Sequence, residues 1–174
     1  GRGGENPPTH PKTATTAATP TAAPATNVAL SNVSNVLVDN YNGAAGQGAA
    51  EVTLDIEMVA AVAPHANMLV YEGPNTLQGL NDTYARIVND NKAQIVSTSW
   101  GLCESVSGST ELQLLDNIFK QGSAQGISFF AAAGDAGAYD CSDTNLGVDS
   151  PASDPYVTGV GGTSLVLNAD GSYK

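Results

Sequence analysis

Hydrophobic side chains recur along this chain with two kinds of spacing. Three stretches repeat them every three or four positions, the spacing of one helix face, and predict helices at residues 49–63, 76–91 and 110–125. Shorter apolar stretches lie before, between and after them, and these predict strands at residues 35–39, 67–71, 94–99, 127–133, 156–161 and 163–167. A turn is expected at residues 168–171, where Asn-Ala-Asp-Gly interrupts the apolar pattern.

Strands and helices alternate in this prediction. Several strands, such as residues 127–133, are apolar at almost every position, so both of their faces are expected to be buried. Strands of this kind, joined by helices, form parallel sheets with helices on both faces. The predicted fold class is therefore α/β, with a parallel sheet flanked by helices.

The first residues of the chain have a different composition. Residues 1–26 are rich in Thr, Ala and Pro and carry hardly any large apolar side chain. Such a stretch buries too little surface to offset the entropy of ordering it. We therefore divide the chain into a linker or mobile arm at residues 1–26 and one folded domain at residues 27–174.

The charge of the chain excludes two classes of partner. Acidic residues outnumber basic ones by 17 to 6, which gives a formal net charge of -11. This surface repels a nucleic-acid backbone and an anionic membrane, so neither is expected as a partner, and acidic surroundings suit it better. The sequence contains no long apolar run and no signal peptide, and its start at Gly1 leads us to expect a processed or excised segment.

Two acidic residues stand one helical turn apart. Glu51 and Asp55 are four positions apart in the first predicted helix, which places them on one face. Two close carboxylates do not readily ionise together, so one of them can hold a proton and assist the other in general acid and base catalysis. A solvated helix face is the alternative interpretation of the pair.

A third acidic residue follows an apolar strand. Asp135 comes after residues 127–133, at the carboxyl end of the predicted strand, where catalytic groups gather in open α/β sheets. A protonated carboxyl group there can donate a hydrogen bond to a developing oxyanion. The alternative is an Asp that only stabilises a turn between Gly134 and Gly137.

Taken together, four sequence motifs resemble a known family. They are Glu-Val-Thr-Leu-Asp-Ile at residues 51–56, Ser-Thr-Ser-Trp-Gly at 97–101, Phe-Phe-Ala-Ala-Ala-Gly-Asp-Ala-Gly at 129–137 and Ser-Pro-Ala-Ser-Asp-Pro-Tyr-Val-Thr-Gly-Val-Gly-Gly-Thr at 150–163. In this order they resemble the sedolisins, which are serine-carboxyl peptidases with a subtilisin-like fold. The resemblance covers residues 28–167. It implies an incomplete copy of that fold, from a secreted endopeptidase that acts on polypeptides at acid pH through an acyl-enzyme.

The resemblance also implies roles for individual residues. Glu51 would be the general base toward the serine, Asp55 would orient Glu51, and Asp135 would be the oxyanion acid. Trp100 matches a tryptophan in the hydrogen-bonded shell behind the two acids, although an aromatic residue at a strand end is also ordinary core. Together with Ser99 and Gly101 it would offer backbone groups to an extended substrate.

Parts of the family pattern lie outside this sequence. The serine nucleophile and the calcium ligands of the family are expected beyond Lys174, so we expect no cofactor and no metal site in this chain. Ser164 belongs to a strand motif and is not expected to be the nucleophile, and Glu5 is a poor counterpart for the acid that supports Asp55. The chain alone should be inactive. A second chain that carries the serine is one possible partner, and a non-catalytic fragment or degenerate binding or scaffold domain is the alternative.

The remaining candidate residues lie in loops. Cys103 follows the Trp100 motif and Cys141 follows the Asp135 motif, so a disulfide between them would join two loops at one edge of the sheet. Two unpaired buried thiols are the alternative. Asp140 and Asp143 lie near the same edge, where they either shape a substrate pocket or only solvate a loop.

Overall fold

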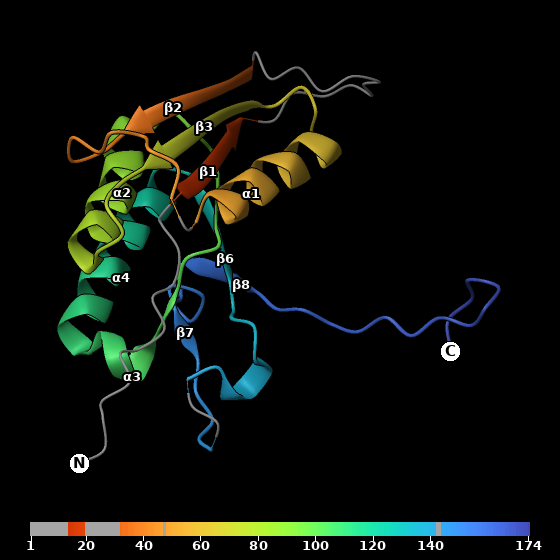
Figure 1. The fold of residues 1–174 in the computed structure, drawn as a ribbon. Coiled ribbons are helices and arrows are strands. Elements are labelled where there is room, and N and C mark those ends of the chain that lie inside the picture. Colours follow the sequence, from red (N-terminus) through yellow and green to blue (C-terminus); the bar gives the residue numbers. More distant parts are fainter. Residues whose placement is uncertain (1–13, 20–31, 47, 142–143) are drawn as a thin grey trace.

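The computed structural model describes residues 14–19, 32–46, 48–141 and 144–174 (Figure 1). Its helices are α1 at Ala49–Val62, α2 at Leu77–Asp90, α3 at Glu104–Ser107 and α4 at Ser109–Ala124, with a 3-10 turn at Gly137–Tyr139. Its strands are β1 at Ala14–Thr19, β2 at Val33–Leu37, β3 at Asn67–Glu72, β4 at Ile95–Thr98, β5 at Leu102–Cys103, β6 at Ser128–Ala132, β7 at Asp149–Ser150 and β8 at Val157–Val160.

Six strands form one sheet in the order β2-β3-β1-β4-β6-β8. The pairs β2 with β3, β4 with β6 and β6 with β8 are parallel, as predicted for helix-linked strands. Strand β1 is antiparallel to both of its neighbours, β3 and β4. A separate two-stranded antiparallel sheet joins β5 to β7. The main sheet is therefore parallel apart from one strand.

Helices cover the two faces of this sheet (Figure 1). Val70 and Tyr71 are neighbours in β3, so their side chains point to opposite faces. Tyr71 packs in the cluster that contains residues of α2 and α4, such as Ile87 and Phe119. Val70 packs in a second cluster with Trp100 and with residues of α1. Helix α1 thus covers one face, and α2 and α4 cover the other.

The three long helices are confirmed to within one residue at each end, and five of the six predicted strands are found. The predicted strand at residues 163–167 is wrong: after β8 only Leu167 forms a bridge, with Tyr173, across the predicted turn. Leu165 and Val166 are 65% and 56% exposed, so apolar side chains occur there without a surface to pack on. The short elements α3, β5 and β7 carry too few residues to show a period.

Strand β1 lies inside residues 1–26, the segment that composition assigns to a linker or arm. Its sequence, Ala-Thr-Thr-Ala-Ala-Thr, lacks the apolar side chains typical of a central strand. Its backbone pairs with β3 from Ala14 to Thr19 and with β4 from Thr15 to Ala18. The backbone pairing, rather than the pattern of side chains, defines this strand, and the domain boundary at residue 26 stays a prediction.

Helix α1 is apolar on two faces. Val52 and Ile56 pack against the cluster around Trp100. On the other face Leu54, Met58 and Val62 are 50%, 57% and 83% exposed. The helical recurrence of these three residues correctly predicts the helix, but they form a stripe on its outward face. None of the helices in the described part of the chain has the length and apolar character needed to cross a membrane.

Three aromatic rings hold the α2 and α4 side of the sheet together. The ring of Phe119 lies edge to face with Tyr84 at 5.0 Å and with Phe129 at 4.9 Å between centroids. Phe119 is 1% exposed, and Tyr84 is fully buried. Such pairs add to the free energy gained by burying the rings, so Phe119 joins α2, α4 and β6 at a single point.

Replacing Phe119 by Ala should therefore be costly. We expect Phe119→Ala to lower the free energy of unfolding by about 3 to 5 kcal/mol, because it leaves a cavity between three elements. Urea unfolding followed by circular dichroism measures this change. Leu114→Ala on the same helix is the control, since Leu114 is 45% exposed and its loss should cost less than about 1 kcal/mol. Equal losses in the two variants would contradict this account of the core.

Candidate active site

The two acids of α1 occupy the start of the helix. The chain reaches α1 through a glycine-rich loop and enters it after Gly48. Glu51 lies in the first turn, where the helix dipole favours a negative charge. Asp55 follows one turn later, and both residues are partly buried. The charge of Glu51 acts on the carboxyl group of Asp55, so the structure brings the predicted pair together.

Asp55 is held by a residue of the sheet. The hydroxyl of Ser99, which directly follows β4, donates a hydrogen bond of 2.8 Å to Oδ1 of Asp55. The second oxygen, Oδ2, is buried and has no hydrogen-bond partner within the described part of the chain. Burial raises the pKa of Asp55, the Ser99 hydrogen bond lowers it, and the charge of Glu51 raises it again, with a net upward shift. Asp55 therefore retains a proton more readily than an ordinary aspartate does.

This shift makes the stability of the fold depend on pH. A raised pKa means that the folded chain binds the Asp55 proton more tightly than the unfolded chain, so stability falls as pH rises from the ordinary value of 3.8 through the raised one. We expect Asp55→Asn, which carries no charge at any pH, to lose less stability than the wild type between about pH 3 and about pH 7. Urea unfolding at the two pH values measures the difference.

A second variant should change this pH dependence in the opposite direction. Ser99→Ala removes the hydrogen bond that lowers the pKa of Asp55. Stability should then fall more between the two pH values than it does in the wild type. The same pH dependence in wild type, Asp55→Asn and Ser99→Ala would contradict the electrostatic role of Asp55.

The residues after β4 lie between the acid pair and the small sheet. Trp100 is 6% exposed and forms a cluster with Val70, against which Val52 and Ile56 of α1 pack, so this cluster supports the helix that carries the acids. This packing is the core role that the sequence analysis gave as one interpretation of Trp100. Its place in a hydrogen-bonded shell behind the two acids stays a prediction. A Cβ at Gly101 would lie 3.2 Å from the carbonyl oxygen of Ser150, so the chain passes closely over β7. Substrate binding by these residues also stays a prediction.

Asp135 lies in an exposed loop that Asp140 shapes. Oδ1 of Asp140 accepts hydrogen bonds from the backbone N–H groups of Asp135, at 2.9 Å, and Ala136, at 2.7 Å. Gly134 has a φ of 92°, and a Cβ there would lie 2.3 Å from Oδ2 of Asp140. The sequence offered pocket shaping or loop solvation for Asp140, and the structure shows that it holds the Asp135 loop. Asp143 lies outside the described residues.

Removing the Asp140 carboxylate should loosen this loop. In Asp140→Ala two backbone N–H groups lose their acceptor, so we expect hydrogen exchange at Asp135 and Ala136 to become at least about tenfold faster. Nuclear magnetic resonance measures the exchange rate of each amide, and the β6 amide of Phe129 serves as the internal reference. Asp140→Asn keeps an acceptor oxygen and should show a smaller change. Unchanged exchange in Asp140→Ala would rule out this role.

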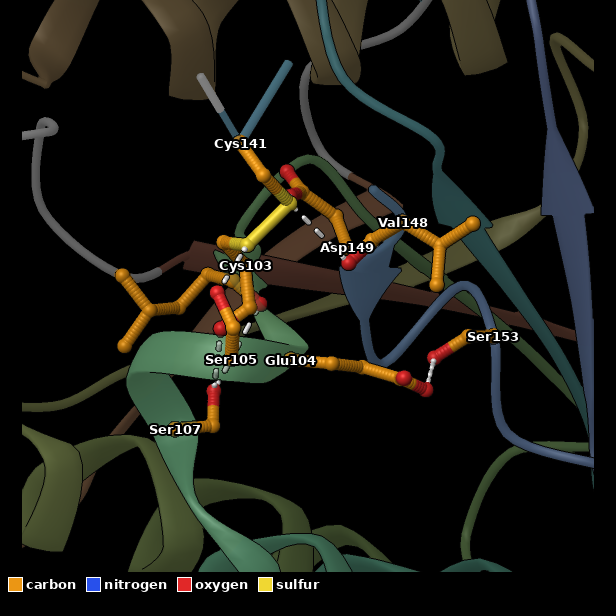
Figure 2. The surroundings of a disulfide bond; sticks show 9 residues. Cys103, Glu104, Ser105, Ser107, Cys141, Val148, Asp149 and Ser153 are labelled. Carbon is orange, nitrogen blue, oxygen red and sulfur yellow. Dashed lines mark hydrogen bonds between the residues drawn. A yellow bond between two sulfur atoms is a disulfide. The ribbon is translucent and has the colours of Figure 1, made fainter. Parts of the chain in front are cut away.

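The predicted disulfide between Cys103 and Cys141 is present, with an S–S distance of 2.09 Å (Figure 2). It joins β5 to the segment after the 3-10 turn, and therefore ties the Asp135 loop to the small sheet. Gly147 packs closely on it, because a Cβ at that position would lie 2.5 Å from Sγ of Cys141. Among described residues, one group of three potential metal ligands occurs, formed by these two cysteines and Asp149. Its sulfur atoms are bonded to each other and are not thiolates.

A cavity of about 1240 Å³ lies beside Asp135. Its walls come from the Asp135 loop, the disulfide, the start of α3, residues 145–149 and residues 161–164. Glu51, Asp55 and Trp100 are not among its lining residues. The structure thus groups Asp55 with Glu51 and Ser99, and places Asp135 at a cavity that none of these three residues lines.

Two supporting residues were not predicted in these roles. Ser99 was singled out for its backbone, whereas its hydroxyl holds Asp55. Asp140 was singled out for the pocket, whereas it holds the Asp135 loop. A hydroxyl residue at the end of a strand that faces an acidic helix could have indicated the first role. An Asp five positions after a glycine-bounded Asp could have indicated the second.

Residues 40–166 match the subtilase family, Peptidase S8. The chain belongs to the subtilase family. Kumamolisin from Bacillus sp. (strain MN-32) is 38% identical over 146 residues, which cover 82% of this chain and 26% of that protein. Sedolisin from Pseudomonas sp. (strain 101) is 33% identical over 140 residues, which cover 74% and 24%. Tripeptidyl-peptidase 1 from Bos taurus is 31% identical over 127 residues, which cover 69% and 23%.

A solved structure of Pseudomonas sedolisin, complexed with two molecules of pseudo-iodotyrostatin, matches this subtilase chain with a TM-score of 0.72 and 30% identity. The match covers 82% of this chain and 43% of that one. The predicted subtilisin-like α/β fold and the sedolisin relationship are confirmed. The chain spans about a quarter of the length of the curated relatives it matches.

Proposed function

We propose that this chain supplies the acidic catalytic groups of a sedolisin-type serine endopeptidase that cleaves polypeptides at acid pH. The observation that carries the proposal is the partly buried Asp55, which has a raised pKa, is held by Ser99 and lies one turn from Glu51. An exposed surface pair would not need the Ser99 hydrogen bond or a buried oxygen. The serine nucleophile comes from a segment outside this chain or from a second chain.

In the proposed reaction Glu51 accepts the proton of the serine hydroxyl as the serine oxygen attacks the peptide carbonyl carbon. Asp55 holds Glu51 in position by sharing a proton with it. Asp135, in its protonated form, donates a hydrogen bond to the oxyanion of the tetrahedral intermediate. Glu51 then passes its proton to the leaving amine, which gives the acyl-enzyme. Water releases the product by the same steps in reverse order.

The proposal includes an acidic, extracellular setting. The excess of 17 acidic over 6 basic residues and the disulfide support it, because disulfides persist in oxidising compartments. Calcium binding is proposed only for the part of the protein outside this chain. The relative from Bos taurus carries the name tripeptidyl-peptidase 1, so release of tripeptides from a peptide end is the competing form of the same chemistry.

The test uses a protein in which this chain is joined to, or mixed with, the segment that carries the serine nucleophile of the family. We expect hydrolysis of an unstructured polypeptide at about pH 4, and a loss of roughly 10² to 10⁴ in kcat for Glu51→Ala and of roughly 10² to 10³ for Asp135→Ala. Mass spectrometry of the products separates internal cleavage from stepwise release of tripeptides.

Glu57→Gln is the matched control, because Glu57 lies on the same helix and is exposed. It should retain the activity of the wild type. Undiminished turnover in Glu51→Ala or Asp135→Ala would refute the assigned roles. A complete absence of hydrolysis in the protein with the serine segment would favour the alternative of a non-catalytic binding or scaffold domain.

A further inference from the structure

The connection from β2 to α1 contains the only Asn-Gly pair of the sequence, Asn42-Gly43 (the orange segment after β2 in Figure 1). Both residues are exposed. An Asn side chain in a turn readily bonds to its own backbone, because one methylene separates its amide group from the main chain. The same short distance brings its side-chain carbon, Cγ, within reach of the backbone nitrogen of the next residue. Asn42 is therefore a candidate for a reaction within the chain itself.

The fold turns the side chain of Asn42 toward the backbone that follows it. The N–H group of Ala44 donates a hydrogen bond of 3.0 Å to Oδ1 of Asn42, so the side-chain carbonyl faces the segment that contains the nitrogen of Gly43. A donor on this oxygen also stabilises the negative charge that develops there when Cγ is attacked. The hydroxyl of Tyr41 donates to the carbonyl oxygen of Ala44 at 2.8 Å and ties its ring to the same turn.

Gly43 leaves the attacking nitrogen unhindered. It has no side chain, and its φ of 67° lies in the left-handed region, which glycine adopts without strain. Asn145 and Asn168 are also exposed, but each is followed by a residue that has a side chain. Such a side chain crowds the nitrogen that has to close the ring. Asn42 should therefore react faster than the other two.

We propose that Asn42 is a site of self-modification, where the chain deamidates at neutral and alkaline pH. The backbone nitrogen of Gly43 attacks Cγ of Asn42, so an N–Cγ bond forms and the Cγ–Nδ2 bond breaks. The proton of the Gly43 N–H leaves with the amide group as ammonia. Water then opens the five-membered succinimide ring. Opening at the side-chain carbonyl gives aspartate, and opening at the main-chain carbonyl gives isoaspartate, whose backbone runs through Cβ and Cγ.

Both products alter the segment that leads to the acid pair. Each adds a carboxylate next to Gly43, which lines a small pocket together with Glu72 and the start of α1. Isoaspartate also adds one methylene to the main chain between β2 and α1, ahead of Glu51 in the first turn of the helix. Conversion should therefore shift the first turn of α1.

The reaction should be slow in acid, because the Gly43 nitrogen attacks only after its proton is removed. Tyr41 and Glu72 are the titratable residues that line the pocket beside Gly43. An acidic setting would thus preserve Asn42, whereas neutral surroundings would convert it with time. Deamidation needs neither the serine nucleophile nor the acid pair, so it is independent of the proposed peptidase activity.

The test follows the folded chain during incubation at about pH 8 and at about pH 5. Digestion in acid and mass spectrometry locate a gain of about one dalton at each Asn, and protein isoaspartate methyltransferase detects isoaspartate. At the higher pH we expect Asn42 to convert at least about tenfold faster than Asn145 or Asn168. At the lower pH its rate should be at least about tenfold smaller.

Two variants separate this site from general damage to the chain. Asn42→Gln should abolish conversion at this position, since the longer side chain has to close a six-membered ring. Asn168→Gln is the matched control and should leave the conversion of Asn42 unchanged. On conversion of the wild type, the nuclear magnetic resonance signals of the Ala44 and Glu51 amides should shift, while that of Phe129 in β6 should not.

Three results would overturn the proposal. One is conversion of Asn42 no faster than that of Asn145 and Asn168. Another is a rate in the folded chain more than about tenfold below the rate in urea, since the fold would then block the reactive geometry. The third is an unchanged Glu51 amide in fully converted chain, which would remove the effect on the first turn of α1.

Discussion

Strands β4 and β6 run parallel, with Thr98 paired to Ala131, so both strands end at the same edge of the sheet. Ser99 and Asp135, which follow these two strands, therefore start from the same edge. Ser99 leaves the end of β4 and reaches Asp55 on the helix that covers one face. Asp135 leaves the end of β6 and reaches the cavity. Because parallel strands align their carboxyl ends, residues far apart in sequence can serve one reaction.

The two halves of the site are held by different kinds of interaction. Core packing positions the acid pair, because α1 packs on the cluster that contains Trp100 and Asp55 accepts a hydrogen bond from Ser99 at the end of β4. Local hydrogen bonds hold the Asp135 loop, because Asp140 lies at its base and the Cys103–Cys141 disulfide ties it to β5. Loss of core packing should therefore act first on the pair, whereas loss of the loop contacts should act first on Asp135 and the cavity.

The sequence was sufficient to predict features that repeat or that form motifs. The helices α1, α2 and α4 repeat apolar residues over 14 or 16 positions, which is enough to show a period. Contacts between distant segments had no such signal: Ser99 and Asp55 are 44 positions apart, and their hydrogen bond exists only once β4 and α1 are packed. Strand β1 shows the same limit, because partners on both sides define it and its own side chains do not.

The outward face of α1 connects the fold to the proposed chemistry. Leu54 is three positions from Glu51, and Met58 is three positions from Asp55, so the exposed apolar stripe runs beside the acid pair. In the proposed mechanism, a serine that reaches Glu51 lies beside this stripe. The segment that carries it would cover Leu54 and Met58 and exclude water from the flank of the pair. Further burial would raise the pKa of Asp55 further. The contact that brings the nucleophile would therefore help Asp55 to retain the proton that it shares with Glu51 in the proposed mechanism.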